Sequence, residues 1–262
     1  MSIEIIKFVR TPHLEGSRLQ SGDEDLSQVR VSELFGKRVI IEEKVDGANA
    51  GISFSHDGSL LLQSRGHYLT GGPREKHWDL FKQWAAVHEA TLLNIIGDRY
   101  IIYGEWLFAK HTVFYDLLPH YFLAFDVFDK ETNTFISTQR RLELLHGSPI
   151  VSVNIIQDSI ITCLDDITQL ITMSYYKTGR WKDNLNTQAQ NAGVAYDVAL
   201  RQTDKNDTME GLYIKVENDD SVLERYKWVR SSFLNSIADA DGHWLERPII
   251  QNMLAPYVDI FR

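Results

Sequence analysis

The sequence predicts an α+β fold in which antiparallel sheets are flanked by helices. Segments rich in β-branched and aromatic residues, typical of strands, dominate toward both ends of the chain. Helical spacing of apolar residues appears between them, most clearly in residues 78–93. Separate blocks of strands and helices favour an α+β arrangement over a βαβ fold, in which the two kinds of element alternate.

Each expected element follows from its local composition. Strands are expected at residues 39–41, 50–54, 60–63, 100–106, 121–128, 211–216 and 225–229. A hairpin turn is expected at residues 56–59, because Gly58 tolerates the positive φ that such turns need. Helices are expected at residues 78–93, 139–146, 166–173 and 186–202.

Composition narrows the class of protein. The 262 residues suffice for one large domain or two small ones, and 44% hydrophobic with 24% charged residues is ordinary for a globular chain. A single cysteine, Cys163, excludes an internal disulfide and a cysteine-rich zinc site. The chain has neither an apolar run of roughly 20 residues nor a signal-like start, so a cytoplasmic protein without a membrane partner is expected.

The formal net charge of -9 argues against a protein that coats nucleic acid by bulk attraction. It leaves room for a site with local positive charge. Basic residues gather in three short stretches, at residues 65–77, 177–182 and 225–230. For any one stretch, solvated surface charge is the simpler interpretation.

Lys44 is the candidate nucleophile. It ends an apolar strand and begins a Lys-x-Asp-Gly sequence that continues to Asn49. A lysine amine has a pKa of roughly 10.4 and is protonated at neutral pH, so it must be activated by desolvation or by a neighbouring cation. The alternative is a structural lysine at a strand end, paired with Glu42 or Asp46.

Further candidate residues lie on or beside expected strands. Arginine and lysine suit phosphate or ribose oxygens, a carboxylate suits ribose hydroxyls or a metal ion, and an aromatic ring suits a base. By strand alternation Glu105 shares a face with Ile101 and Tyr103, and Lys215 faces away from Glu210 and is left out of the site. The candidates are Arg65, Glu105, Phe125, Glu210, Arg225 and Lys227.

Together these segments, in this order, resemble the covalent nucleotidyltransferases: ATP-dependent RNA and DNA ligases and mRNA capping enzymes. The resemblance covers roughly Ile40 to Arg230. It implies a nucleotidyltransferase fold, like that of ATP-grasp ligases, in which Lys44 attacks ATP and carries AMP as lysyl-AMP. It also implies ATP and Mg²⁺ or Mn²⁺ as cofactors.

The resemblance assigns a role to each candidate. Arg65 contacts the ribose or the RNA end, Glu105 accepts hydrogen bonds from the ribose, and Phe125 stacks on the purine. Glu210 organises the metal, usually through water. Arg225 and Lys227 contact the α-phosphate. Family members carry a lysine where this chain has Arg225, so contact by Lys227 alone is the alternative.

The residues around Lys44 most resemble the nick-sealing and RNA-editing branch of RNA ligases. That likeness implies that Glu43 recognises the adenine amino group and that Asn49 lies near the phosphates. The implied substrate is RNA with 5′-phosphate and 3′-hydroxyl ends. A DNA ligase, a GTP-using capping enzyme and a non-catalytic nucleotide- or RNA-binding module remain alternatives.

The expected domain organisation is a nucleotidyltransferase domain at residues 1–230 and a short helical tail at residues 231–262. The sequence after residue 230 is too short for an OB-fold domain, so none is expected. Substrate binding then falls to the tail or to a partner. The sequence leaves open whether an end-healing kinase or phosphatase acts with the protein.

Overall fold

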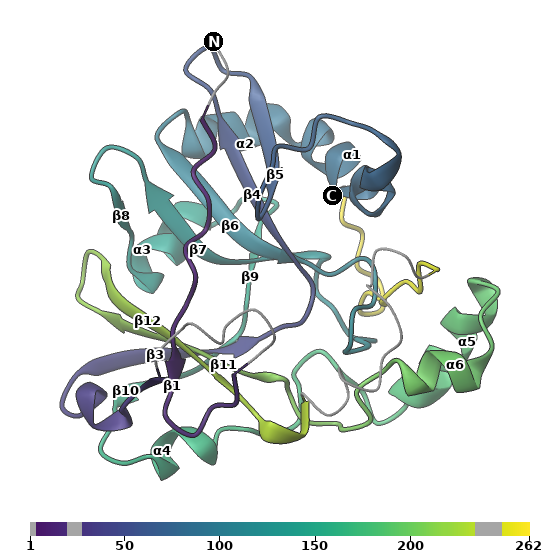
Figure 1. Cartoon of the computed structure of the whole chain (residues 1–262). Coiled ribbons are helices and arrows are strands. Elements are labelled where there is room, and N and C mark those ends of the chain that lie inside the picture. Colours follow the sequence, from purple (N-terminus) through teal and green to yellow (C-terminus); the bar gives the residue numbers. More distant parts are fainter. Residues whose placement is uncertain (1–3, 20–27, 234–247) are drawn as a thin grey trace.

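A computed structural model describes residues 4–19, 28–233 and 248–262 as two six-stranded sheets with helices packed around them (Figure 1). The first, sheet I, has the strand order β10 (Ile155–Ile160), β3 (Arg38–Lys44), β11 (Gly211–Glu217), β12 (Val222–Val229), β1 (His13–Leu14), β2 (Gln28–Val29). The second, sheet II, has the order β5 (Leu60–Ser64), β4 (Ala48–Phe54), β6 (Tyr100–Trp106), β7 (Phe122–Asp129), β8 (Thr134–Phe135), and β9 (Val151–Ser152) also pairs with β7.

The expected α+β class with antiparallel sheets is confirmed. The central strands of both sheets pair antiparallel, whereas β1, β2 and β9 pair in parallel at the periphery. Every strand expected from the sequence is present. The sequence missed β1, β2, β8 and β9, which have two residues each, and the strand β10, which lies at the edge of sheet I.

Helices differ from expectation mainly where the chain turns. The structure has α1 (Asp79–Val87), α2 (Glu89–Ile96), α3 (Thr138–Leu145), α4 (Asp165–Thr168), α5 (Trp181–Asn191) and α6 (Tyr196–Arg201), with 3₁₀ turns η1 (Val31–Leu34) and η2 (Pro73–Trp78). The expected helix at residues 186–202 is wrong as one element. Gly193 has φ 68° and ends the first of two helices, because a left-handed residue cannot continue a right-handed helix. The expected helix at 166–173 shrinks to α4.

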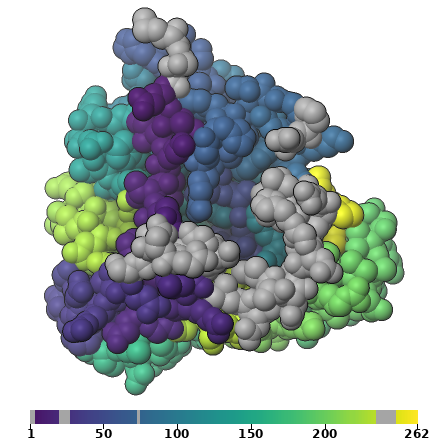
Figure 2. All heavy atoms as spheres, viewed as in Figure 1, coloured from purple at the N-terminus to yellow at the C-terminus, as the bar shows by residue number. Residues whose placement is uncertain are grey.

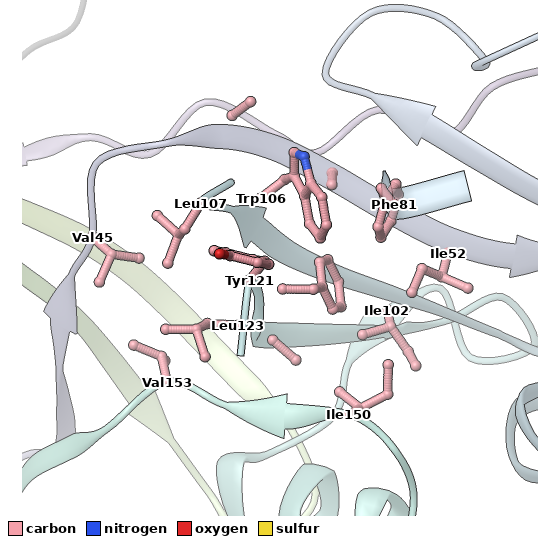
Figure 3. Close-up of a cluster of buried hydrophobic side chains, with 14 of the residues drawn as sticks. Val45, Ile52, Phe81, Ile102, Trp106, Leu107, Tyr121, Leu123, Ile150 and Val153 are labelled. Carbon is pink, nitrogen blue, oxygen red and sulfur yellow. The ribbon is translucent and has the colours of Figure 1, made fainter. Parts of the chain in front are cut away.

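The main hydrophobic core packs sheet II against α1 and α2. Trp84, Phe81 and Trp106 are almost fully buried within it. Figure 3 shows Trp106, Tyr121 and Leu107 side by side in this core, with Val45 at its edge. A second core covers the face of sheet I that carries Leu212 and Ile214. Each sheet therefore packs against a hydrophobic core of its own.

Of the expected helical tail, residues 231–233 are helical, whereas residues 248–262 form no helix. Residues 248–262 pair with the main body through single bridges, Gln251 with Ala109 and Leu254 with Leu118. The side chain of Asn252 accepts from the amide of Tyr115 and donates to the carbonyl of Leu107. The rest of the predicted tail helix, residues 234–247, lies outside the described residues. Among the described residues no helix has both the length and the apolar character that a membrane span requires.

Candidate active site

Lys44 lies where the chain leaves one sheet and enters the other. It is the last residue of β3 in sheet I, and β4 of sheet II begins at Ala48. Gly211 lies opposite Lys44 on β11. The Lys-x-Asp-Gly sequence is thus the crossover between the two sheets, which places the lysine amine in the space between them.

Asp46 fixes this crossover. Its carboxylate accepts hydrogen bonds from the amides of Thr112 (2.7 Å) and Val113 (2.8 Å), and its own amide donates to the Tyr115 hydroxyl (2.8 Å). Lys44 itself forms its ion pair with Glu210 at 2.7 Å, and not with Glu42 or Asp46, the partners in the structural alternative. Asp46 anchors a loop, and that loop holds the turn after Lys44.

Gly47 is required by close packing. A Cβ atom at this position would lie 2.7 Å from the carbonyl oxygen of Trp106 and 2.7 Å from the Leu107 side chain. The Gly47 amide also donates to the Glu105 carboxylate at 3.2 Å. A side chain here would push β4 away from β6 and separate Glu105 from the crossover.

A cavity of about 300 Å³ opens between the sheets beside Lys44. Most of the side chains expected from the sequence line it. They are Glu43, Lys44, Asn49, Arg65, Glu105, Phe125 and Lys227. Asn49 and Glu105 are direct cross-strand partners on β4 and β6, which explains why they meet at one wall.

Glu210 and Arg225 do not line the cavity, and they lie in different places. Glu210 is 1% exposed and forms an ion pair with Lys44 at 2.7 Å. Arg225 lies 3.5 Å from Asp126, and its guanidinium packs on the rings of Phe135 (3.7 Å) and Phe8 (5.3 Å). These contacts hold the Arg225 side chain against the protein, whereas Lys227 lines the cavity.

Carboxylates hold Lys44 in its charged form. Burial alone would lower the pKa of Lys44, but the negative charges of Glu210, Glu105 and Asp46 outweigh it and raise this pKa. Burial raises the pKa of Glu105 to about 8, against the opposing effect of the cations Lys44 and Arg65. Lys44 therefore needs a further positive charge nearby before it can act as a nucleophile.

Phe125 reaches the cavity because of a β-bulge. Tyr103 pairs with Asp126 and the next residue, Gly104, pairs with Ala124, so Phe125 is the extra residue of β7. A bulge turns such a side chain out of strict alternation. The Phe125 ring packs edge-on against Phe8 at 5.1 Å and remains half-buried at the cavity wall.

Glu43 lines the cavity, but its carboxylate already accepts hydrogen bonds from other residues of the protein. It accepts hydrogen bonds from the Ser174 hydroxyl and from the Tyr175 amide at 2.9 Å. An adenine amino group would have to compete with these donors for the same oxygens. Burial raises the pKa of Glu43 to about 7, although both hydrogen bonds act to lower it.

This burial predicts a pH effect on stability in the nucleotide-free protein. Between the unfolded pKa of 4.5 and the folded pKa of about 7, the folded protein keeps a proton that the unfolded chain releases. Wild-type stability therefore falls as pH rises through this window. Glu43→Gln cannot titrate, so its stability relative to wild type should rise by up to about 3 kcal/mol.

Urea unfolding at pH 5 and pH 7.5 measures this difference. Glu33→Gln, which changes an exposed glutamate, is the matched control and should follow wild type. A Glu43→Gln difference that stays constant with pH contradicts the assignment of a buried, proton-binding Glu43.

The donor set fits a hard divalent cation. Glu210 and Glu105 present carboxylate oxygens around Lys44, and Mg²⁺ or Mn²⁺ prefers such ligands together with water and phosphate oxygens. In the part of the chain that the structure describes, no group of three His, Cys, Asp or Glu side chains is arranged to hold a metal ion. Phosphate oxygens and water would therefore complete the coordination.

The sequence reasoning missed part of the cavity wall. Residues 8–11, near the N-terminus, line it together with Val153 and Tyr213. Residues 8–11 have no regular secondary structure, so strand or helix patterns give no signal there. Tyr213 could have been found, because it shares a face of sheet I with Lys227, its cross-strand partner.

Comparison with known proteins identifies the family. A model of the RNA ligase family matches residues 37–229, so the chain belongs to the RNA ligase family. Its fold is that of the nucleotidyltransferases, as expected from the sequence. No curated protein matches the chain.

Solved structures of a Naegleria gruberi RNA ligase share this fold. A mutant with ATP and Mn has a TM-score of 0.56 at 15% identity, over 89% of this chain and 59% of that one. Another mutant, with AMP and Mn, has a TM-score of 0.52 at 15% identity, over 79% of this chain and 54% of that one. The chain thus spans little more than half the length of these ligases.

Proposed function

We propose that this protein is an ATP-dependent RNA ligase that carries AMP on Lys44. The observation that carries the proposal is the position of Lys44. It lies at the crossover of the two sheets, beside a cavity whose wall holds an aromatic ring, Phe125, and the cations Arg65 and Lys227. A base, a ribose and a chain of phosphates are the ligand groups that such a wall suits.

The chemistry proceeds in three steps. The neutral amine of Lys44 attacks the α-phosphorus of ATP, a P–N bond forms, and the bond to pyrophosphate breaks. A 5′-phosphate oxygen of RNA then attacks the same phosphorus and takes AMP, returning the electron pair to the lysine nitrogen. Finally a 3′-hydroxyl attacks the activated 5′-phosphorus, loses its proton, and releases AMP.

The chain's own residues orient this reaction. Lys227 neutralises the α-phosphate, Phe125 stacks on the purine, and Glu105 and Arg65 hold the ribose or the RNA end. Glu210 pairs with the protonated amine of Lys44 and so keeps it in place until ATP arrives. Mg²⁺ or Mn²⁺ held through Glu210 would lower the pKa of Lys44 and neutralise the leaving pyrophosphate.

The proposed substrate is RNA with 5′-phosphate and 3′-hydroxyl ends, and an end-healing kinase or phosphatase is the kind of partner that would supply such ends. A cytoplasmic location remains a prediction from the composition. The alternatives differ in the nucleotide or the strand: a capping-type enzyme uses GTP, a DNA ligase joins DNA ends, and a binding module forms no covalent adduct.

One labelling experiment tests the proposal. The wild-type protein, incubated with Mg²⁺ and ATP labelled at the α-phosphate, should acquire an acid-stable label and release pyrophosphate. GTP labelled in the same way should give little product. Absence of the label on wild-type protein contradicts the function, and equal labelling by GTP contradicts the choice of ATP.

Sealing assays then distinguish the strands. Nicked duplexes with RNA at the 3′-hydroxyl end should be sealed faster than those with DNA at that end. Preferential joining of all-DNA nicks contradicts the assignment as an RNA ligase even where lysyl-AMP forms.

A further inference from the structure

The N-terminal strap, residues 6–12, runs from sheet II to sheet I across one side of the cavity. Figure 1 shows it in purple, descending from the strands of sheet II toward β1 and β12, and Figure 2 shows it at the molecular surface. The match to the RNA ligase family begins at residue 37, so the strap lies outside it. The motifs that define the nucleotidyltransferase site do not include it.

Hydrogen bonds fix both ends of the strap. The Ile6 carbonyl accepts from the Tyr103 hydroxyl at 2.7 Å and from the Gln63 amide side chain at 2.9 Å, both in sheet II. The Pro12 carbonyl accepts from the amide of Lys227 at 2.9 Å, in sheet I. The strap therefore joins the two sheets and is tied to the strand that carries the phosphate-facing lysine.

Phe8 fixes the middle of the strap. Its ring lies 5.1 Å from that of Phe125, 5.2 Å from that of Tyr103 and 5.8 Å from that of Phe135. Aromatic pairs at these distances favour a defined geometry. The four residues from Phe8 to Thr11 all line the cavity, so the strap forms part of the cavity wall.

Arg10 lies on this wall between the two anchors. It is two residues from the Phe8 cluster and two from the Pro12 hydrogen bond, which restricts its main chain. Its side chain is exposed although the residue lines the cavity, which places it at the mouth. Arg10 joins Lys44, Arg65 and Lys227 as a fourth cation on the wall.

We propose that Arg10 binds the β- and γ-phosphates of ATP, the pair that leaves as pyrophosphate; this inference rests on the proposed function. A guanidinium offers several donors in one plane and pairs with phosphate oxygens in a bidentate way. The leaving pyrophosphate must reach solvent, and Arg10 lies at the mouth. An RNA 5′-phosphate presents the same chemistry, so the test separates the two sources.

The test compares the affinities for ATP and AMP. In a Lys44→Ala background, where no transfer occurs, Arg10→Gln should weaken ATP binding roughly tenfold to hundredfold, as expected for a charged hydrogen bond. AMP binding should be unchanged, because AMP lacks these phosphates. Arg10→Lys should recover part of the ATP affinity.

Lys7→Gln is the matched control. It removes one positive charge from the same strap at an exposed residue that does not line the cavity, so both affinities should stay at the parent value. Equal loss of ATP and AMP affinity in Arg10→Gln, or no loss of either, overturns the proposal. So does a Lys7→Gln effect as large as that of Arg10→Gln.

Sealing of pre-adenylated RNA bypasses ATP and separates the two phosphate sources. With Lys44 restored, Arg10→Gln should seal such RNA at the wild-type rate. A defect confined to this step assigns Arg10 to the RNA phosphate and overturns the polyphosphate assignment. Failure of the wild-type protein to form lysyl-AMP contradicts the proposed function itself. That result is obtained without any Arg10 variant, so it is distinct from failure of the Arg10 proposal.

Discussion

Lys44→Arg is expected to abolish formation of the labelled lysyl-AMP adduct, by a factor on the order of 10³ or more. A guanidinium stays protonated at any pH at which proteins work, so it has no lone pair with which to attack the α-phosphorus. Its positive charge still faces Glu210, which accepts from Lys44 at 2.7 Å in the wild-type protein. The variant should therefore fold normally and lose only the chemistry.

Three measurements make this result specific. Lys37→Arg, the same change at a half-exposed lysine just before β3, should label like wild type. Lys44→Arg should still bind ATP, and it should still seal pre-adenylated RNA, because that step does not use the amine. Labelling of Lys44→Arg at a tenth of the wild-type rate or faster assigns the nucleophile to another residue.

The central strands and the candidate site residues could be predicted because the sequence patterns that indicate them are short-range. Val39 to Ile41 predicts a buried strand, and the Lys-x-Asp-Gly sequence predicts a turn after it. The partners of those residues are long-range. Asp46 bonds to Thr112 and Val113, and Lys44 pairs with Glu210, which only the register of β3 against β11 brings together.

Side-chain direction was the less predictable part. Strict alternation cannot foresee the bulge that turns Phe125 toward the cavity. It cannot foresee that Ser174 and Tyr175 engage Glu43, or that Phe135 and Asp126 engage Arg225. These directions depend on tertiary packing, which the composition of a single strand does not encode.

A buried network of charges beneath the cavity explains how Phe125 is held. The Lys215 amine donates to the Phe125 carbonyl at 2.9 Å and lies 3.1 Å from Glu42, 3.4 Å from Asp126 and 3.9 Å from Glu217. All of these ionic side chains are at most 2% exposed. Lys215 does not line the cavity.

Arg141, on α3, completes this network. Its guanidinium donates to the Phe125 carbonyl and to the Glu42 carboxylate, so two cations meet at one backbone oxygen of the bulge. Because the bulged residue lacks a regular ladder partner, its carbonyl needs such donors. The network therefore connects sheet I, sheet II and α3 at the residue proposed to stack on the adenine.

Lys215→Met is expected to destabilise the protein by about 3–5 kcal/mol. Methionine fills much of the same volume, but it leaves Glu42, Asp126 and Glu217 buried without their shared cation. Burial of an uncompensated charge costs far more than the loss of an exposed pair. Urea unfolding measures the loss, and the KM for ATP should rise in the folded variant because Phe125 is held less firmly.

Lys37→Met separates the effect of burial from the effect of charge. Lys37 pairs with Glu224 at 2.8 Å, with both side chains nearly 40% exposed, so its loss should change the unfolding free energy by less than about 1 kcal/mol. A Lys215→Met variant as stable as Lys37→Met would mean that Arg141 alone holds the bulge. In that case the KM for ATP should also stay at the wild-type value, because the two effects share one cause.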